Sequence, residues 1–291
     1  MSQTLSQPQE SNFEIHIRPN QSWLGVDLRA IWEFRDLLLL LVRRDFVARY
    51  QQTALGPAWA IVQPLVMTLV FTLVFGKFAG ISTDGLPPML FYLCGLLAWN
   101  YHALTLQQTG STFTLNAALF GKVYFPRLII PLSVALSNVI SFLIQVGMFG
   151  LFWFYFKFFT SAGAHFSSGL GALFLPLLLL HVAVLSVGAG LLLSCCTAKY
   201  RDLQHLLPLI IQVWLYLTPV IYPLSKVPSR YQWIIALNPM TAPVEMIRRV
   251  LLGEGVVDLG QYLYSLGASG LLLIAGVMLF QRTERTFIDT V

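Results

Sequence analysis

Charged residues fall in short stretches of this chain, and long uncharged tracts separate them. Six tracts contain no Asp, Glu, Lys or Arg: residues 51–76, 85–121, 128–156, 158–198, 203–225 and 259–281. Each tract is longer than the roughly 18 apolar residues that make a transmembrane helix a candidate. The pattern predicts helices at about 58–78, 87–108, 128–156, 172–196, 206–223 and 260–281.

The composition supports this interpretation. The chain has 291 residues, of which 56% are hydrophobic and 11% charged, whereas a soluble domain carries roughly 25% charged residues. A soluble protein would have to bury six such segments on all sides, and no residues would remain to cover them. The predicted fold is therefore an all-α polytopic membrane protein with six transmembrane helices.

Three regions are expected along the chain. Residues 1–22 form a polar leader, residues 23–56 contain an amphipathic interface helix, and residues 57–291 form the six-helix transmembrane domain. The first 50 residues contain no apolar core and no small-residue cleavage site, so no signal peptide is expected.

Lysine and arginine are divided unevenly between the two sides that six crossings define. Twelve of the eighteen lie before the first span, in the second–third and fourth–fifth connections, or in the C-terminal tail. The side that is richer in Lys and Arg is the cytoplasmic side. Both termini are therefore expected in the cytoplasm.

The stretch DLRAIWEFRDLLLLLVRRDF (27–46) is amphipathic at 100° per residue. Its apolar strip consists of Leu28, Ile31, Trp32, Leu38, Leu39, Val42 and Phe46, with Arg35 as the exception. Such a helix lies along the membrane surface with its charges toward water. It is either a simple anchor or a docking platform for a cytoplasmic partner.

The connection between the second and third spans has a distinct pattern. Asn116 is expected to cap a short helix that begins near Ala117. Pro126 disfavours helical geometry at the residue before it, so the chain bends there and restarts as the third span. Arg127 is then expected at the cytoplasmic interface, where its cation reaches water or lipid phosphate. The segment is either an inert connector or a lever.

An apolar stretch on the opposite side is too short to cross a membrane. YQWIIALNPMTAPV (231–244) contains 14 uncharged residues, a length typical of re-entrant or interfacial segments. Asn238 and Pro239 interrupt it. We expect two short helices between spans five and six, within residues 224–259, that form a re-entrant hairpin in the outer leaflet. Irregular backbone at that depth needs protein or a water-lined cavity around it, so the hairpin is a candidate lid over an exit.

The sequence lacks the motifs of several enzyme classes. The Gly-Lys pairs at 76–77 and 121–122 are followed by Phe78 and Val123, so no P-loop is present. His102 and His181 are each alone in a span without an Asp or Glu, which disfavours a proton relay. We expect neither a catalytic residue, a metal site nor a cofactor in this chain.

Aromatic and amide side chains are the main polar features of the predicted spans. The candidates for a substrate channel are Trp99, Tyr101, Trp214 and Tyr216. Aromatic faces stack on sugar rings, while amides and hydroxyls bond to hydroxyl groups. The alternative is lipid or packing contact, because Trp and Tyr gather at membrane interfaces.

Four segments in this order carry a family resemblance: RRDFVARYQQTALGPAWAIVQPL (43–65), NAALFGKVYFPRLIIPLS (116–133), AKYRDLQHLLPLIIQVWLYLTPVIYP (198–223) and LNPMTAPVEMIRR (237–249). Together they resemble the membrane permease subunit of ABC-2 type exporters. The polysaccharide branch, which includes O-antigen, capsule and teichoic-acid exporters, matches most closely. The resemblance covers nearly the whole chain from about residue 23.

The resemblance implies a homodimeric permease in the bacterial inner membrane, with each copy seated on a separate ATPase subunit that binds ATP and Mg²⁺. A channel at the dimer interface would move a lipid-linked polysaccharide outward. Membrane lipids are expected partners, and nucleic acid is not.

The resemblance also implies roles for particular residues. ATPase coupling is expected from Arg35, Arg43, Arg44, Asn116, Lys122, Arg127, Tyr200, Arg201 and Asp202. The periplasmic gate is expected at Tyr222, Trp233, Asn238 and Pro239.

Two other functions remain open from the sequence. One is an ABC exporter of small hydrophobic compounds, because pore width cannot be read from residues. The other is an integral membrane transferase, which would need polar catalytic residues at the membrane surface. The cytoplasmic loops offer only Asp202 with His205 as a near pair.

Overall fold

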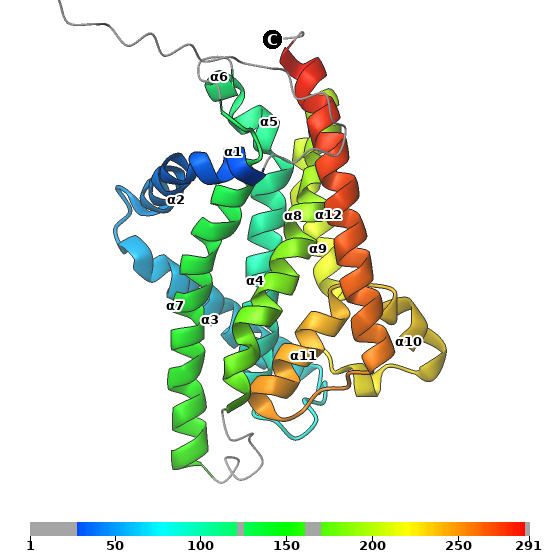
Figure 1. Ribbon diagram of the computed structural model, residues 1–291. Coiled ribbons are helices and arrows are strands. Elements are labelled where there is room, and N and C mark those ends of the chain that lie inside the picture. Colours follow the sequence, from blue (N-terminus) through cyan, green and yellow to red (C-terminus); the bar gives the residue numbers. More distant parts are fainter. Residues whose placement is uncertain (1–27, 121–124, 161–169, 289–291) are drawn as a thin grey trace, which may run out of the picture.

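The computed structural model describes residues 28–120, 125–160 and 170–288, and every regular element in these ranges is helical (Figure 1). The all-α prediction is therefore confirmed for this part of the chain. Long helices suit a membrane because each backbone amide finds its partner within its own helix. The principal helices are α3 (Trp59–Phe71), α4 (Pro88–Gly110), α7 (Ile129–Phe159), α8 (Leu175–Lys199), α9 (Leu203–Leu217) and α12 (Leu259–Ile288).

Five helical runs in the described ranges are long and apolar enough to cross a membrane. They are Gly56–Phe78, Pro88–Gly110, Ile129–Phe159, Gly171–Lys199 and Leu259–Glu284. A run of 23 residues is about 34 Å long, which exceeds the roughly 30 Å of a hydrocarbon layer. These runs coincide with five of the six predicted spans. The first run joins a 3₁₀ turn (η1, Gly56–Ala58) to α3 and to a π-helical segment (η2, Thr72–Phe78).

The predicted fifth span is shorter than expected. Helix α9 has 15 residues and ends at Leu217, whereas the pattern predicted helix through residue 223. Thr218 is extended, with φ −103° and ψ 139°, because Pro219 follows it and disfavours helical geometry at the preceding residue. A helix of this length reaches about 22 Å and needs the chain beyond it to complete a crossing.

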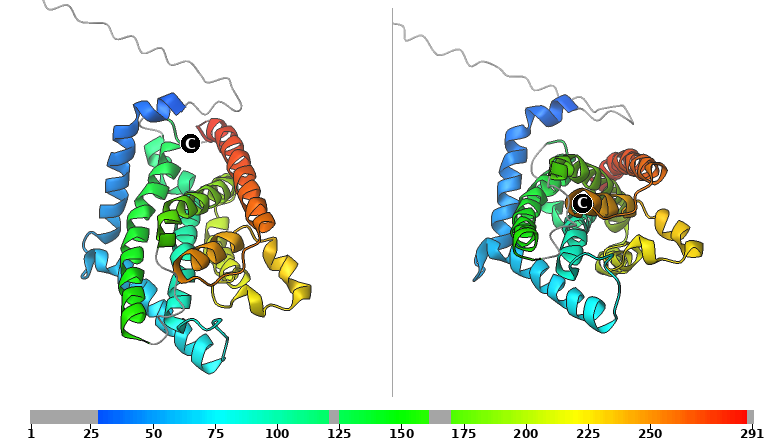
Figure 2. Two further views of the ribbon diagram at one scale, coloured as in Figure 1. Left: turned by 60° about the horizontal axis from the view of Figure 1, so that its bottom comes forward. Right: turned by 90° about the horizontal axis from the view of Figure 1, so that it is seen from below.

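The two ends of the helical bundle are built differently (Figure 1). One end, which we call the α2 end, holds α1 (Leu28–Glu33), α2 (Arg35–Tyr50), α5 (Thr112–Leu115), α6 (Ala117–Phe120) and the C-terminal end of α12. Toward the other end, the α11 end, lie α10 (Ser229–Ala236) and α11 (Thr241–Leu252). Seen along the bundle, α2 lies across the view while α12 points along it (Figure 2). Helix α2 is therefore transverse to the spans.

The apolar strip predicted for the N-terminal helix needs correction. Phe34 separates α1 from α2, and the face of α2 that packs on α7 contains Leu37, Leu38 and Leu41. Leu39, which was placed on the same strip as Leu38, is 62% exposed. Helix α2 has apolar residues on two faces, because it contacts a neighbouring span as well as the surroundings of the bundle. The predicted strip merged these two faces.

Helices α8 and α12 approach each other closely at glycines. A Cβ atom added to Gly188 would lie 2.6 Å from the backbone nitrogen of Leu273, and one added to Gly276 would lie 2.6 Å from the Gly188 carbonyl oxygen. Small residues allow such close packing between membrane helices. The last span is therefore attached to the bundle through backbone contact.

We predict that Gly188→Ala lowers the free energy of unfolding by about 1–3 kcal/mol, because backbone atoms cannot move aside for the added methyl group. The matched control is Gly270→Ala on α12, where an added Cβ meets nothing within 4 Å. Unfolding of the purified protein by sodium dodecyl sulfate, followed by circular dichroism, measures both variants. Equal stability of the two would contradict the close packing.

Candidate functional site

A cleft of 870 Å³ opens among α3, α4, α7 and α9, with the last turn of α2 at its edge. Its lining mixes aromatic, amide and apolar side chains, including Trp59, Gln63, Met67, Trp99, Asn100, Tyr101, Gln107, Asn138, Ser141, Gln145 and Gln212. Among the described residues that line it, Arg49 is the one charged residue. The cleft can therefore accept a polar, largely uncharged ligand and place one cation against it.

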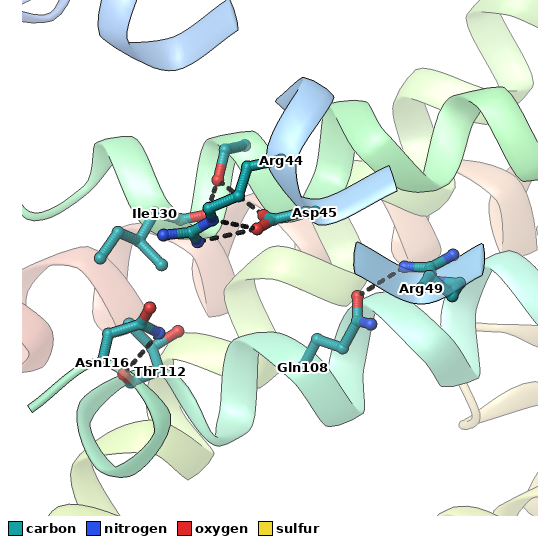
Figure 3. Close-up of polar contacts among 8 residues, drawn as sticks. Arg44, Asp45, Arg49, Gln108, Thr112, Asn116 and Ile130 are labelled. Carbon is teal, nitrogen blue, oxygen red and sulfur yellow. Dashed lines mark hydrogen bonds and ion pairs between the residues drawn. The ribbon is translucent and has the colours of Figure 1, made fainter. Parts of the chain in front are cut away.

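Arg49 reaches from α2 to both α4 and α7. Its Nη2 donates to Asn138 Oδ1 at 2.7 Å and to Gln108 Oε1 at 3.4 Å, and its Nη1 donates to Ser141 Oγ at 3.1 Å. Figure 3 shows the bond to Gln108. The Tyr50 hydroxyl also lies 3.3 Å from Ser141 Oγ. All three acceptors of Arg49 are neutral.

A polar row on α7 faces α4 within the cleft. Asn138, Ser141 and Gln145 are spaced by three and four residues, which places them on one helical face. Asn138 Nδ2 donates to Thr105 Oγ1 at 3.0 Å, and Asn100 Nδ2 donates to Gln145 Oε1 at 3.1 Å. These hydrogen bonds join α4 to α7. They also give the polar side chains partners that lipid hydrocarbon cannot provide.

The four predicted channel residues are divided between two places. Trp99 and Tyr101 line the cleft, and the Tyr101 hydroxyl donates to the carbonyl of Ala135 at 3.2 Å. Trp214 and Tyr216 do not line it. The Trp214 Nε1 donates to Asn238 at 2.9 Å, and Tyr216 is 52% exposed. A channel role stays a prediction for all four residues.

The predicted gate region contains the two short helices that the sequence indicated, α10 and α11. Asn238 in the turn between them accepts from the backbone nitrogen of Met240 at 3.0 Å and donates to Thr218 Oγ1 at 2.8 Å. The Pro239 carbonyl accepts from Ser265 on α12. This turn is therefore fixed to the end of α9 and to the start of α12.

The other two predicted gate residues, Tyr222 and Trp233, both precede this turn in the chain. Trp233 on α10 is 62% exposed. The hydroxyl of Tyr222 donates to the Tyr216 carbonyl at 3.2 Å.

A buried ion pair on α11 was not anticipated from the sequence. Glu245 and Arg248 are each 1% exposed and form a salt bridge. Arg248 also donates to the Pro219 carbonyl at 2.8 Å, and its guanidinium lies 4.0 Å from the centre of the Phe91 ring. Glu245 accepts from the backbone nitrogen of Val256 at 3.1 Å. The pair joins α11 to α4, to the non-helical segment after α9 and to the loop before α12.

The arginines predicted to contact an ATPase along α2 differ in their surroundings. Arg35 lies 3.9 Å from Asp36 and stacks near the Trp32 ring at 5.7 Å, and Arg43 is exposed. Arg44 binds Asp45 with two donors, at 2.7 and 2.9 Å, above the start of α7 (Figure 3). These cations lie on the outer part of the α2 end.

Arg127 is buried, which corrects the expectation that its cation reaches water or lipid phosphate. It is 7% exposed, donates to the Glu284 carbonyl at 3.0 Å and pairs with the Glu284 carboxylate at 3.5 Å. Its guanidinium also lies 4.9 Å from the centre of the Phe120 ring. Because α12 and α6 enclose the cation, the segment before α7 is attached to the end of the last helix.

Asn116 and Lys122 complete the predicted contacts of this segment. Helix α6 begins at Ala117 as predicted, but the Asn116 amide donates back to the Thr112 carbonyl at 3.1 Å (Figure 3). Asn116 therefore closes α5 with its side chain and starts α6 only through its backbone carbonyl. Lys122 lies outside the described residues.

The turn between α8 and α9 exposes the remaining predicted residues, Tyr200, Arg201 and Asp202. The Lys199 ammonium lies 5.2 Å from the centre of the Tyr200 ring. Just after the turn, the Gln204 side chain donates to Thr114 on α5. The structure thus brings this turn together with the segment that follows α4.

The protein belongs to the ABC-2 type transporter family, whose pattern matches residues 36–252. This range includes α2, the cleft, the buried ion pair and all but the last spanning helix.

Several curated proteins align along most of the chain. The O-antigen export system permease protein RfbA of Klebsiella pneumoniae is 24% identical over 255 residues, which cover 87% of this chain and 94% of the relative. The protein of the same name from Myxococcus xanthus is 25% identical and covers 91% and 98%. The polysialic acid transport protein KpsM of Escherichia coli is 23% identical and covers 86% and 94%.

Sequence reasoning missed the residues that organise the cleft and the gate. The spacing of Asn138, Ser141 and Gln145 was a readable signal, because a polar row in an apolar span marks a face that meets another helix. From the sequence, Arg49 counts only as one of the cations before the first span, and Arg248 only as one of the cations on the opposite side. Only their three-dimensional contacts distinguish them from surface charges.

We predict that Glu245→Gln lowers the free energy of unfolding by about 3–5 kcal/mol, because it leaves the Arg248 cation buried without a counter-charge. The control is Arg249→Gln, at an exposed position on the same helix. Unfolding in detergent measures both variants. The double variant Glu245→Leu/Arg248→Met should recover much of the loss, since it removes both charges. If Glu245→Gln were as stable as Arg249→Gln, the result would contradict a stabilising role for the buried Glu245–Arg248 pair.

Proposed function

We propose that the protein is the membrane permease of an ATP-driven exporter that moves a lipid-linked polysaccharide out of the cytoplasm. The ATPase is a separate subunit, and two copies of this chain form the channel. The observation that carries the proposal is the cleft between α3, α4, α7 and α9, because it offers aromatic rings and amides to a ligand in a family of transporters.

The substrate class is supported by the relatives and by the chemistry of the cleft. The names of the aligned relatives refer to O-antigen, polysialic acid and capsule polysaccharide. Trp99 and Tyr101 supply aromatic surface, while Asn100 and Gln107 supply amide donors and acceptors. Such a lining makes weak, repeated contacts with successive sugar residues.

The proposed topology has six crossings, with α9 and residues 218–223 as the fifth. Helix α8 ends at the α2 end, whereas α12 begins toward the α11 end (Figure 1), so the chain between them traverses the bundle. Helix α11 lies at the level of the lower turns of α7 (Figure 1), which supports a re-entrant hairpin. Six crossings place both termini on the α2 side.

The α2 end is the proposed cytoplasmic side. Its helices, together with the end of α8, the α8–α9 turn and the residues just before α7, carry most of the described cations: Arg29, Arg35, Arg43, Arg44, Arg49, Arg127, Lys199, Arg201 and Arg282. Lys and Arg are enriched on the cytoplasmic side of membrane proteins. An ATPase seated there would contact α2 and the exposed α8–α9 turn, and its movement would pass through α5 and α6 to the spans.

Removal of the gene from its own host tests the substrate class. We expect loss of the surface polysaccharide and accumulation of its lipid-linked form inside the cell, because synthesis continues without an exit. Immunoblotting of surface and cytoplasmic fractions measures both pools. Greater sensitivity to hydrophobic drugs with unchanged polysaccharide would instead support export of small hydrophobic compounds.

The contact between Arg127 and Glu284 tests the coupling route. We predict that Arg127→Glu weakens this contact by at least about 1.5 kcal/mol and reduces export, while the partner ATPase continues to hydrolyse ATP. The double exchange Arg127→Glu/Glu284→Arg restores opposite charges and should recover export. Polysaccharide export and phosphate release are measured on the same membranes. Normal export in the single variant would contradict this route.

A further inference from the structure

We propose that Arg49 is the centre of a subsite for a phosphate or diphosphate group carried on an apolar chain. The subsite lies in the cleft at its α2 edge. The proposal rests on the proposed export function for the source of the phosphate, but the site itself follows from the contacts of Arg49.

Among the described residues, Arg49 lacks the carboxylate partner that several other arginines have. Arg127 pairs with Glu284, Arg248 with Glu245 and Arg44 with Asp45. Arg49 has no carboxylate partner within the described residues, and its three acceptors are amide and hydroxyl oxygens. Neutral oxygens orient a guanidinium without cancelling its charge.

Arg49 is partly buried at the edge of the cleft, and no carboxylate of the described chain neutralises its charge there, so the cation stays available to an anionic ligand. A guanidinium has five N–H donors, and three bonds from Arg49 are directed to the protein. The others can bind oxygens of a ligand. Guanidinium groups bind phosphate with strong, charge-assisted hydrogen bonds.

The rest of the cleft indicates what carries the anion. No described residue of the lining bears a negative charge that would repel phosphate. Gln107 and Asn100 add amide groups elsewhere in the same lining, whereas Val66 and Met67 on α3 add apolar surface. Val66 is 52% exposed and Met67 37%, so α3 presents this surface outward at the cleft. An amphiphile with a phosphate head and an apolar tail fits both parts.

The test uses the full-length chain in phosphatidylcholine nanodiscs and farnesyl diphosphate as the probe. Farnesol, which has the same tail without the phosphates, is the comparison ligand. We expect farnesyl diphosphate to bind at least about tenfold more tightly than farnesol, because hydrogen bonds to charged groups contribute about 1.5–3 kcal/mol. Equilibrium dialysis measures both affinities. Equal affinities would overturn the proposal.

Variants assign the effect to Arg49. Arg49→Gln should remove the preference for the diphosphate, Arg49→Lys should keep part of it, and Arg29→Gln, which removes an exposed arginine from α1, should leave it unchanged. Gln107→Glu is a second test at an exposed cleft position. It leaves Arg49 intact but adds a negative charge, and it should also weaken binding. Full affinity in Arg49→Gln, or in Gln107→Glu if Arg49→Gln does not fold, would overturn the proposal.

Competition separates the sources of the phosphate. Displacement by inorganic pyrophosphate indicates that the head group suffices, and displacement by phosphatidylglycerol indicates a site open to bilayer lipids. Either result supports an anion subsite. If the protein proves not to export polysaccharide but still binds farnesyl diphosphate through Arg49, the proposed function fails and the anion subsite stands. Normal export and normal binding in Arg49→Gln would remove the subsite and leave the proposed function standing.

Discussion

Polar side chains on α4 need partners on neighbouring helices, and this requirement determines the centre of the molecule. Among the five candidate spans of the described chain, α4 is the most buried, at 78% of its most apolar window, yet it has the lowest mean hydropathy. Its Asn100 binds Gln145, Thr105 binds Asn138, and His102 lies 2.8 Å from Ser186 Oγ. Because hydrocarbon offers no hydrogen bonds, these groups bring α7 and α8 against α4. In a membrane the least hydrophobic span is thus the one that the others surround.

The same requirement explains which features could be predicted from the sequence. Tract length and the absence of charge depend on the bilayer alone, so five long spans and the α10–α11 break at Asn238–Pro239 were predictable. Pro219 also determines the early end of α9. The uncharged tract continues to residue 225, however, so tract length alone predicted a longer helix. The face of α2 that contacts α7 could not be separated from its outer face, because both are apolar.

The candidate site was less predictable, since it depends on which charges meet. Arg49, Arg127 and Arg248 look alike in sequence, as cations near the ends of uncharged tracts. In the structure Arg248 has an acidic partner on its own helix, Arg127 has one on α12, and Arg49 has only neutral acceptors. Two of these contacts span more than 80 residues of chain. No local pattern distinguishes a cation that holds helices together from one that faces a cleft.

Hydrogen bonds join both ends of the bundle to helices that line the cleft. Residue Asn238 fixes the α10–α11 turn to the end of α9, and Arg127 fixes the start of α7 to α12. Helices α9 and α7 both line the cleft. Both ends of the bundle are therefore connected by hydrogen bonds to helices that form the cleft walls.

The most direct measurement of the central claim is photo-crosslinking of the polysaccharide during export. Benzoylphenylalanine placed at Met67 in the cleft is compared with the same residue at Leu151 on α7, which is 75% exposed and does not line the cleft. If the cleft is the export path, light should attach polysaccharide to the protein at Met67 in an ATP-dependent way and not at Leu151. Equal labelling at both positions, or labelling at Leu151 alone, would contradict the account.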